Sequence, residues 1–259
     1  MSIFFDGPGK GPSLSNQADQ IDQPVILSLD TSSRRTSMAL SRGERLLALF
    51  GAELDHRRSE RLWYELEFLL NEAGVELKDI DLFSACTGPG GFTGLRVGLA
   101  AIKGFARAGD KKVAAVTSLE ALACAQDIAG PVLVTVNAHK GEFYAQLFDS
   151  RTTGLPVARS KPSLASIEEV VASVNQIESL ILIGDGAEAA WERAGQIGPL
   201  KGWRVRVQPD FLAGRMARAA HLKYARGDLV GASELRAIYA RPADAVVKLS
   251  QGLVGKGLR

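Results

Sequence analysis

The chain has 259 residues, of which 46% are hydrophobic and 23% are charged, and its formal net charge is +2. This is globular composition, with enough length for one large domain or two ordinary ones. The sequence has no apolar run of about 18 residues, which excludes a membrane-spanning helix, and the small net charge does not by itself indicate nucleic-acid binding.

The first 24 residues are rich in Gly, Pro, Ser, Asn, Asp and Gln. This composition predicts a flexible extension over 1–24 that packs little. Pro and Gly interrupt it, so a secretory signal is not expected. The two cysteines, Cys86 and Cys124, are far apart in sequence and form no disulfide or zinc pattern. We expect reduced core thiols in a cytoplasmic protein.

Three strands and a helix are predicted after this extension. The apolar run at 25–29 is typical of a buried strand, and residues 36–40 and 46–53 indicate two more strands around a turn at 42–44. Leucines at helical spacing predict a helix over 59–73. Trp63, Tyr64 and Phe68 lie partly off that leucine stripe, so this helix is apolar on more than one side.

The pattern continues with a strand at 82–87, a glycine-rich segment, a helix to about residue 108 and a strand at 113–116. Ser118 is expected to cap a helix through 125. The second half starts near residue 130 and has strands at 132–136, 142–148 and 180–183. It has helices at 167–174 and 213–226, with one more helix and strand between 184 and 209.

Each half therefore contains a strand, a hairpin, a helix and a later strand that ends in a glycine-rich turn. This repetition predicts an α/β protein with two related subdomains, over 25–129 and 130–259.

Three turns that follow predicted strands are candidates for binding a nucleotide. Asp30 follows a buried strand. Its carboxylate could lie near a phosphate and its metal, or Asp30 could belong to an ordinary hydrogen-bonded turn. Gly90 and Gly91 precede a helix, where backbone amides can bind an anion or where glycine simply permits close packing. Gly184 ends a strand in the second half. The spacing matches neither a P-loop nor a dinucleotide fingerprint.

Other polar features are weaker. His56, His139 and His221 are not paired at helical spacing, so each is expected at a polar surface or in a satisfied core position. Residues 201–259 contain twelve Lys and Arg against four Asp and Glu. This basic region either contacts RNA or an acidic partner, or is a solvated helical face.

Several segments occur in the order found in the TsaB family, and the chain resembles that family over about residues 25–242. The glycine-rich segment at 87–96 and the VTSLEAL segment at 116–122 are the parts most specific to this family. The segments are LSLDTS at 27–32, His56 with SERL at 59–62, TGPGGFTGLR at 87–96, VTSLEAL at 116–122, GEFY at 141–144 and YARP at 239–242.

The resemblance implies the actin/sugar-kinase/Hsp70-like fold of two related α/β subdomains with mixed sheets. It implies membership of the bacterial complex that transfers threonylcarbamoyl to N6 of the tRNA adenosine beside the anticodon. In that complex the TsaD-type paralogue is catalytic and holds a metal through an H-x-x-x-H motif, and a TsaE-type ATPase joins the pair.

Two departures from the catalytic pattern indicate an accessory role and not an enzyme. Ser118 and Leu122 stand where the two metal-binding histidines would fall, and a leucine has no lone pair to offer. Asn137 and His139 stand where the family has an Asp and an Arg. The resemblance therefore implies a subunit with no cofactor of its own, whose partners handle ATP and metal.

The resemblance also implies pairing through the first two long helices, with the TsaD-type subunit or as a homodimer when alone. The residues predicted to form this surface are Leu62, Trp63, Leu66, Leu70, Leu95, Leu99 and Ile102. Two alternatives stay open: an ATPase or kinase of this fold, and a tRNA-binding module that uses the basic C-terminal region.

Overall fold

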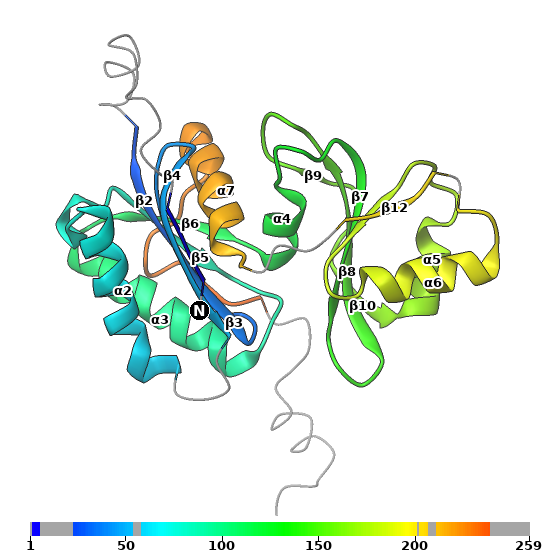
Figure 1. Ribbon diagram of the computed structural model, residues 1–259, viewed down its shortest axis with the longest axis horizontal. Coiled ribbons are helices and arrows are strands. Elements are labelled where there is room, and N and C mark those ends of the chain that lie inside the picture. Colours follow the sequence, from blue (N-terminus) through cyan, green and yellow to red (C-terminus); the bar gives the residue numbers. More distant parts are fainter. Residues whose placement is uncertain (1, 6–22, 54–57, 201, 207–210, 239–259) are drawn as a thin grey trace, which may run out of the picture.

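The computed structural model describes residues 2–5, 23–53, 58–200, 202–206 and 211–238. The chain forms two α/β subdomains that lie side by side, each built on a mixed sheet (Figure 1). The first sheet has the strand order β1-β4-β3-β2-β5-β6, and the second has the order β10-β8-β7-β11-β12, with β9 paired to β8. No helix among the described residues is long and apolar enough to cross a membrane.

The strands of the first sheet are β1 (Ser2–Phe5), β2 (Val25–Asp30), β3 (Arg35–Arg42), β4 (Arg45–Glu53), β5 (Leu82–Cys86) and β6 (Lys112–Val116). Those of the second are β7 (Gly130–Asn137), β8 (Glu142–Ser150), β9 (Val157–Ala158), β10 (Ser163–Ser166), β11 (Ile181–Ile183) and β12 (Arg204–Val205).

The two sheets repeat one topology. In each, three strands form an antiparallel meander, and two later strands add in parallel beside the first strand of that meander. In the second sheet the meander is β7-β8-β10, and the short β9 pairs with β8 between them in sequence. The order β4-β3-β2-β5-β6 therefore corresponds strand by strand to β10-β8-β7-β11-β12. This confirms the predicted actin/sugar-kinase/Hsp70-like fold of two related subdomains with mixed sheets.

Helices cover both faces of the first sheet. α2 (Arg58–Ala73) and α3 (Phe92–Ala108) lie on one face, where Leu69 and Ile102 pack with Phe83 in the core. α7 (Ala213–Arg226) covers the other face. Small residues line that contact, with Ala39 on the sheet against Ala217 on the helix, so the helix can lie close to the strands.

The second sheet is covered in the same way. α5 (Ile167–Val174) and α6 (Ala187–Ile197) pack on one face, and the short α4 (Ser118–Ala123) packs on the other, where Leu119 and Leu122 meet Val134. α5 and α7 have the bounds that the sequence predicted. Thr117, not Ser118, caps α4, because the Thr117 hydroxyl accepts the Glu120 amide at 2.9 Å and Ser118 is already helical.

The extension predicted over 1–24 is not free along its whole length. Residues Ser2–Phe5 form β1, which pairs antiparallel with β4 at the edge of the first sheet. The apolar sequence of this short segment suits an edge strand, and β4 offers it an open row of backbone groups. Residues 6–22 lie outside the described residues, so the rest of that prediction concerns a part of the chain not described.

The predicted second subdomain, 130–259, also needs correction at its C-terminal side. α7 packs on β2, β3 and β6 of the first sheet. Val230 pairs with Val113, and the Ile238 amide donates to the Thr87 carbonyl at 2.8 Å. Residues 211–238 therefore return to the first subdomain, because its sheet has a second apolar face that α2 and α3 leave open.

The packing of Phe211 on β4 yields a test. A Cβ at Gly51 would lie 2.4 Å from the Phe211 ring, so we expect Gly51→Ala to lower the free energy of unfolding by about 1–3 kcal/mol. In a Phe211→Ala background the same change should cost much less. Gly104→Ala is the control, since no atom lies within 4 Å of a Cβ there. Chemical denaturation measures the wild-type chain and these four variants, and equal costs in both backgrounds would contradict this contact.

Candidate functional site

The turn after β2 is closed by its own hydrogen bonds. Asp30 is only 2% exposed, and its Oδ1 accepts the Ser32 amide at 2.9 Å. The Thr31 hydroxyl donates to the Gly94 carbonyl at 2.7 Å. This is the hydrogen-bonded turn that was one of the two interpretations of Asp30.

The glycine-rich loop lies directly on this turn. The Gly91 amide donates to the Ser32 carbonyl at 2.6 Å. A Cβ at Gly90 would lie 2.5 Å from that same carbonyl oxygen, and one at Gly98 would lie 2.3 Å from Thr31 Oγ1. Glycine is therefore required here for close packing. The Ser32 and Gly91 amides already donate hydrogen bonds within the protein, so they do not face an anion.

The second subdomain repeats this arrangement. The Asn137 amide donates to Asp185 Oδ1 at 2.6 Å, and Asn137 Oδ1 accepts the His139 amide at 2.7 Å. Gly184 has a φ of +112°, and a Cβ on it would lie 1.9 Å from the Thr135 carbonyl oxygen. Gly184 therefore allows β11 to lie close to β7. The glycine-rich loop allows the corresponding close contact with the turn after β2 in the first subdomain.

Ser118 and Leu122, which the family resemblance aligns with a histidine pair, have structural roles here. The Ser118 hydroxyl donates to the Pro89 carbonyl at 2.7 Å, and its amide donates to the Gly88 carbonyl at 2.9 Å. Leu122 is buried in the core beneath α4. Among the described residues, no three His, Cys, Asp or Glu side chains gather as metal ligands.

The remaining histidines and cysteines also lack an active-site arrangement. His139 is exposed and His221 is half-buried, while His56 lies outside the described residues. Cys86 and Cys124 are free and buried, as predicted. Burial raises the pKa of Cys124 to about 11 and raises that of Cys86 as well, so both thiols stay neutral and unreactive near pH 7.

Cations of the basic C-terminal region join the two subdomains. Lys223 Nζ lies 3.1 Å from both Glu120 and Asp228; burial would lower the pKa of Lys223, but these carboxylates raise it. Arg218 bonds Glu44 at 3.2 Å and the Thr152 carbonyl at 2.8 Å. In the same region Arg206 pairs with Asp127, and Arg215 donates to the Leu122 carbonyl. Much of this charge is therefore used within the protein.

The structure contradicts several members of the predicted partner surface and leaves the others a prediction. Leu66, Leu95, Leu99 and Ile102 are each 6% exposed or less, so the structure contradicts their assignment to a surface. They face the sheet because the leucine stripe of an amphipathic helix covers its own core. Leu62 and Leu70 are half-buried against that core.

An aromatic surface remains on the outside of α2 and α3. Trp63 is 55% exposed, Tyr64 72% and Phe68 39%, and the Trp63 ring lies 6.0 Å from that of Phe105 on α3. Tyr64, Phe68 and Phe105 were missing from the predicted surface. The sequence feature that pointed to Tyr64 and Phe68 was their position off the leucine stripe of α2.

Known proteins resemble this chain in sequence. The sequence profile of the family described as "TsaD: tRNA N6-adenosine threonylcarbamoyltransferase" matches residues 52–161. The chain is 31% identical to the tRNA threonylcarbamoyladenosine biosynthesis protein TsaB of Bacillus subtilis, over 48% of this chain and 55% of that protein. It is 26% identical to the TsaB of Escherichia coli, over 83% of this chain and 94% of that protein.

A solved structure shares the fold. It is a protein of Pseudomonas aeruginosa described as similar to peptidase YEAZ, with a TM-score of 0.70 and 27% identity. The match covers 84% of this chain and 100% of that one. The match to the Bacillus protein, in contrast, spans about half of that relative's length.

The bonded amides lead to a prediction for nucleotides. We expect millimolar Mg·ATP to leave the melting temperature of the isolated chain unchanged, because the turns after β2 and β7 use their amides internally. A ligand at 100 times its Kd would stabilise the fold by about 2.7 kcal/mol, which thermal denaturation detects readily. Ser118→Ala, which removes a buried hydrogen bond, serves as the control that the assay reports stability. A saturable rise with Mg·ATP would contradict the prediction.

Proposed function

We propose that this chain, which is a TsaB/YeaZ-type protein, takes part in tRNA threonylcarbamoyladenosine biosynthesis as a non-catalytic activating subunit. Its partner is a TsaD-type catalytic subunit, with a TsaE-type ATPase joining them. Names of relatives such as the Bacillus and Escherichia proteins support the process. The observation that supports the accessory role best is the aromatic surface of α2 and α3.

Tyr64 and Phe68 are large exposed aromatic side chains one turn apart on α2, and exposed side chains of this kind favour a protein interface. Two exposed small residues, Ala100 and Gly104, occur on α3, the helix whose Phe105 ring lies 6.0 Å from that of Trp63, and small residues allow another helix to approach closely. Aromatic anchors of this kind carry much of the binding energy at protein interfaces. The same surface would pair two copies of the chain in the absence of the TsaD-type subunit, so the two kinds of pairing compete.

The non-catalytic assignment has separate support. Ser118 and Leu122 occupy the metal-ligand positions, and Ser118 is bonded to the glycine-rich loop. In the turns that would hold phosphates in an ATPase of this fold, the Ser32, Gly91 and Asn137 amides donate hydrogen bonds within the protein. ATP and metal chemistry are therefore assigned to the partners.

Charge placed on the aromatic surface tests the pairing. We expect Tyr64→Glu and Trp63→Glu to weaken binding to the TsaD-type subunit by about 30-fold or more, since interface anchors contribute on the order of 2 kcal/mol or more. The fold should survive, because both side chains are mostly exposed. Affinity is measured by calorimetry, homodimerisation by sedimentation and function by tRNA modification in the reconstituted complex.

Tyr224→Glu is the matched control, because Tyr224 is 43% exposed on α7, which covers the opposite face of the first sheet. It should pair and support modification normally. Normal pairing by a folded Tyr64→Glu protein would show that the interface lies elsewhere. Normal modification without this chain would remove the activating role itself.

A further inference from the structure

The edges of the two sheets are closed in different ways. The second sheet ends in β10 and β12, which have only four and two residues. Very short edge strands are one of the ways in which proteins avoid pairing edge to edge with other chains. In the first sheet β6 and β4 would be the edges, and each is covered by a segment that lies far from it in sequence.

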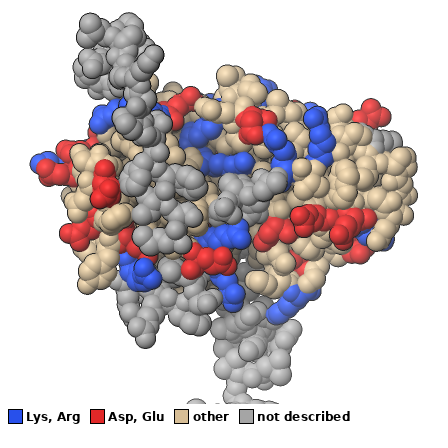
Figure 2. Space-filling model, in the orientation of Figure 1, with Lys and Arg blue, Asp and Glu red and all other residues tan. Residues whose placement is uncertain are grey.

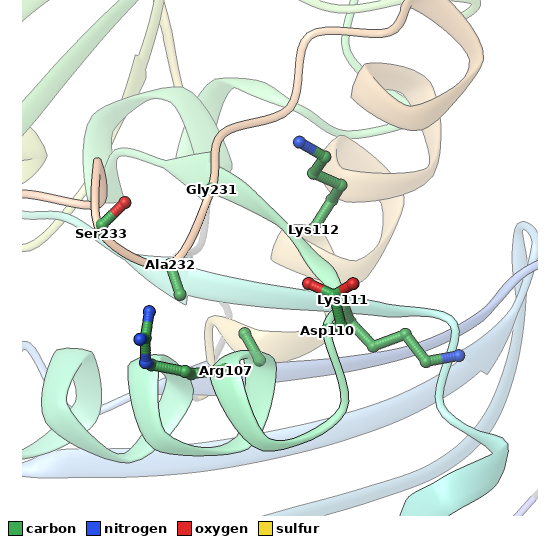
Figure 3. A pocket seen from close by; sticks show the side chains of 8 residues that line it. Arg107, Asp110, Lys111, Lys112, Gly231, Ala232 and Ser233 are labelled. Carbon is green, nitrogen blue, oxygen red and sulfur yellow. The ribbon is translucent and has the colours of Figure 1, made fainter.

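The cover of β6 is the segment that follows α7. Val113 and Val230 exchange two backbone hydrogen bonds of 2.9 Å. The segment continues past the end of α3 that carries Arg107, where Ala232 lies next to that helix (Figure 3). Leu235 is only 1% exposed and belongs to the core around Phe83, so this cover is part of the fold.

β4 is the strand that most needs a cover. It has nine residues, and residues 46–52 contain neither a charged residue nor a proline. A long uncharged edge of this kind is a template for pairing with another chain. Both faces of β4 are occupied, since Phe50 packs in the core beneath α2 and Leu49 packs against Ala217 of α7. Its outer edge is therefore the part that another chain could reach.

The connection to the rest of the chain does not force β1 onto this edge. Residues 2–5 of β1 pair with residues 48–51 of β4. Because β4 and β3 lie between β1 and β2, these two strands are about 14 Å apart, which is three strand spacings. Residues 6–22 join them and could span on the order of 60 Å if fully extended. β1 nevertheless pairs at the long uncharged edge.

We propose that Ser2–Phe5 is an intramolecular cover that keeps the β4 edge from pairing with the β4 edge of a second copy of this chain. A second copy fits because β4 would meet the same uncharged strand in antiparallel orientation across a two-fold axis. β1 itself is a poor edge for another chain. It has four residues and is followed in sequence by Asp6, Gly7 and Pro8, which are unfavourable in strands.

The test removes the cover in the full chain with the double variant Ile3→Pro/Phe4→Pro. Successive amides of a strand point to opposite sides, so one of the two prolines removes a donor toward β4. We expect the self-association constant, measured by sedimentation, to rise about 10-fold or more, because the hydrogen bonds of the edge become available to a second copy. The matched control Asn16→Pro/Gln17→Pro places two prolines outside β1 and should leave this constant unchanged.

Hydrogen exchange of the β4 amides shows whether this edge is the contact. In the diluted Ile3→Pro/Phe4→Pro protein we expect the outward amides of β4 to exchange about 10-fold faster or more than in the parent, and to regain protection on association. Association that leaves these amides unprotected would place the contact elsewhere, such as the aromatic surface of α2 and α3, and would overturn the proposal. A folded variant that associates no more than the parent would do the same. Unfolding of the variant would show that β1 is part of the core and not a cover.

Discussion

The contact between the glycine-rich loop and the turn after β2 determines where α3 begins. Gly90 lies against the Ser32 backbone and Gly98 against the Thr31 side chain, and at both positions an added Cβ would collide with its neighbour. Gly91 and Thr31 then lock the two segments with hydrogen bonds of 2.6 and 2.7 Å. This close approach positions α3 beside α2.

That position of α3 creates the aromatic surface. The inner faces of α2 and α3 are committed to the core around Phe83, so their outer faces must meet solvent or a partner. Phe105 illustrates the division, since its ring lies 6.0 Å from both buried Phe83 and exposed Trp63. The surface is continuous with the core, so a partner bound there would rest on a rigid base.

The C-terminal segment holds the two subdomains in one arrangement. α7 lies on the first sheet and reaches the second subdomain through Arg218, which donates to the Thr152 carbonyl. Figure 2 shows blue side chains gathered over the region between the two halves of the molecule. Several cations of this segment are paired with Glu120, Glu44 or Asp127. The excess of Lys and Arg over Asp and Glu in the C-terminal sequence therefore overstates the positive charge that is available to RNA.

The sequence by itself determined the order and type of most elements and their repetition in two halves, because hydrophobic periodicity and glycine-rich turns are local signals. It did not predict the short strands β1, β9 and β10. It also determined that Ser118 and Leu122 cannot act as a histidine pair. Only the tertiary structure decided which side of each helix is buried: Leu66 and Leu99 belong to the core, while Tyr64 is exposed. It also decided that α7 returns to the first sheet and that β1 closes its edge. These outcomes depend on contacts between segments far apart in the chain, and local periodicity carries no information about which distant face a helix or strand will meet.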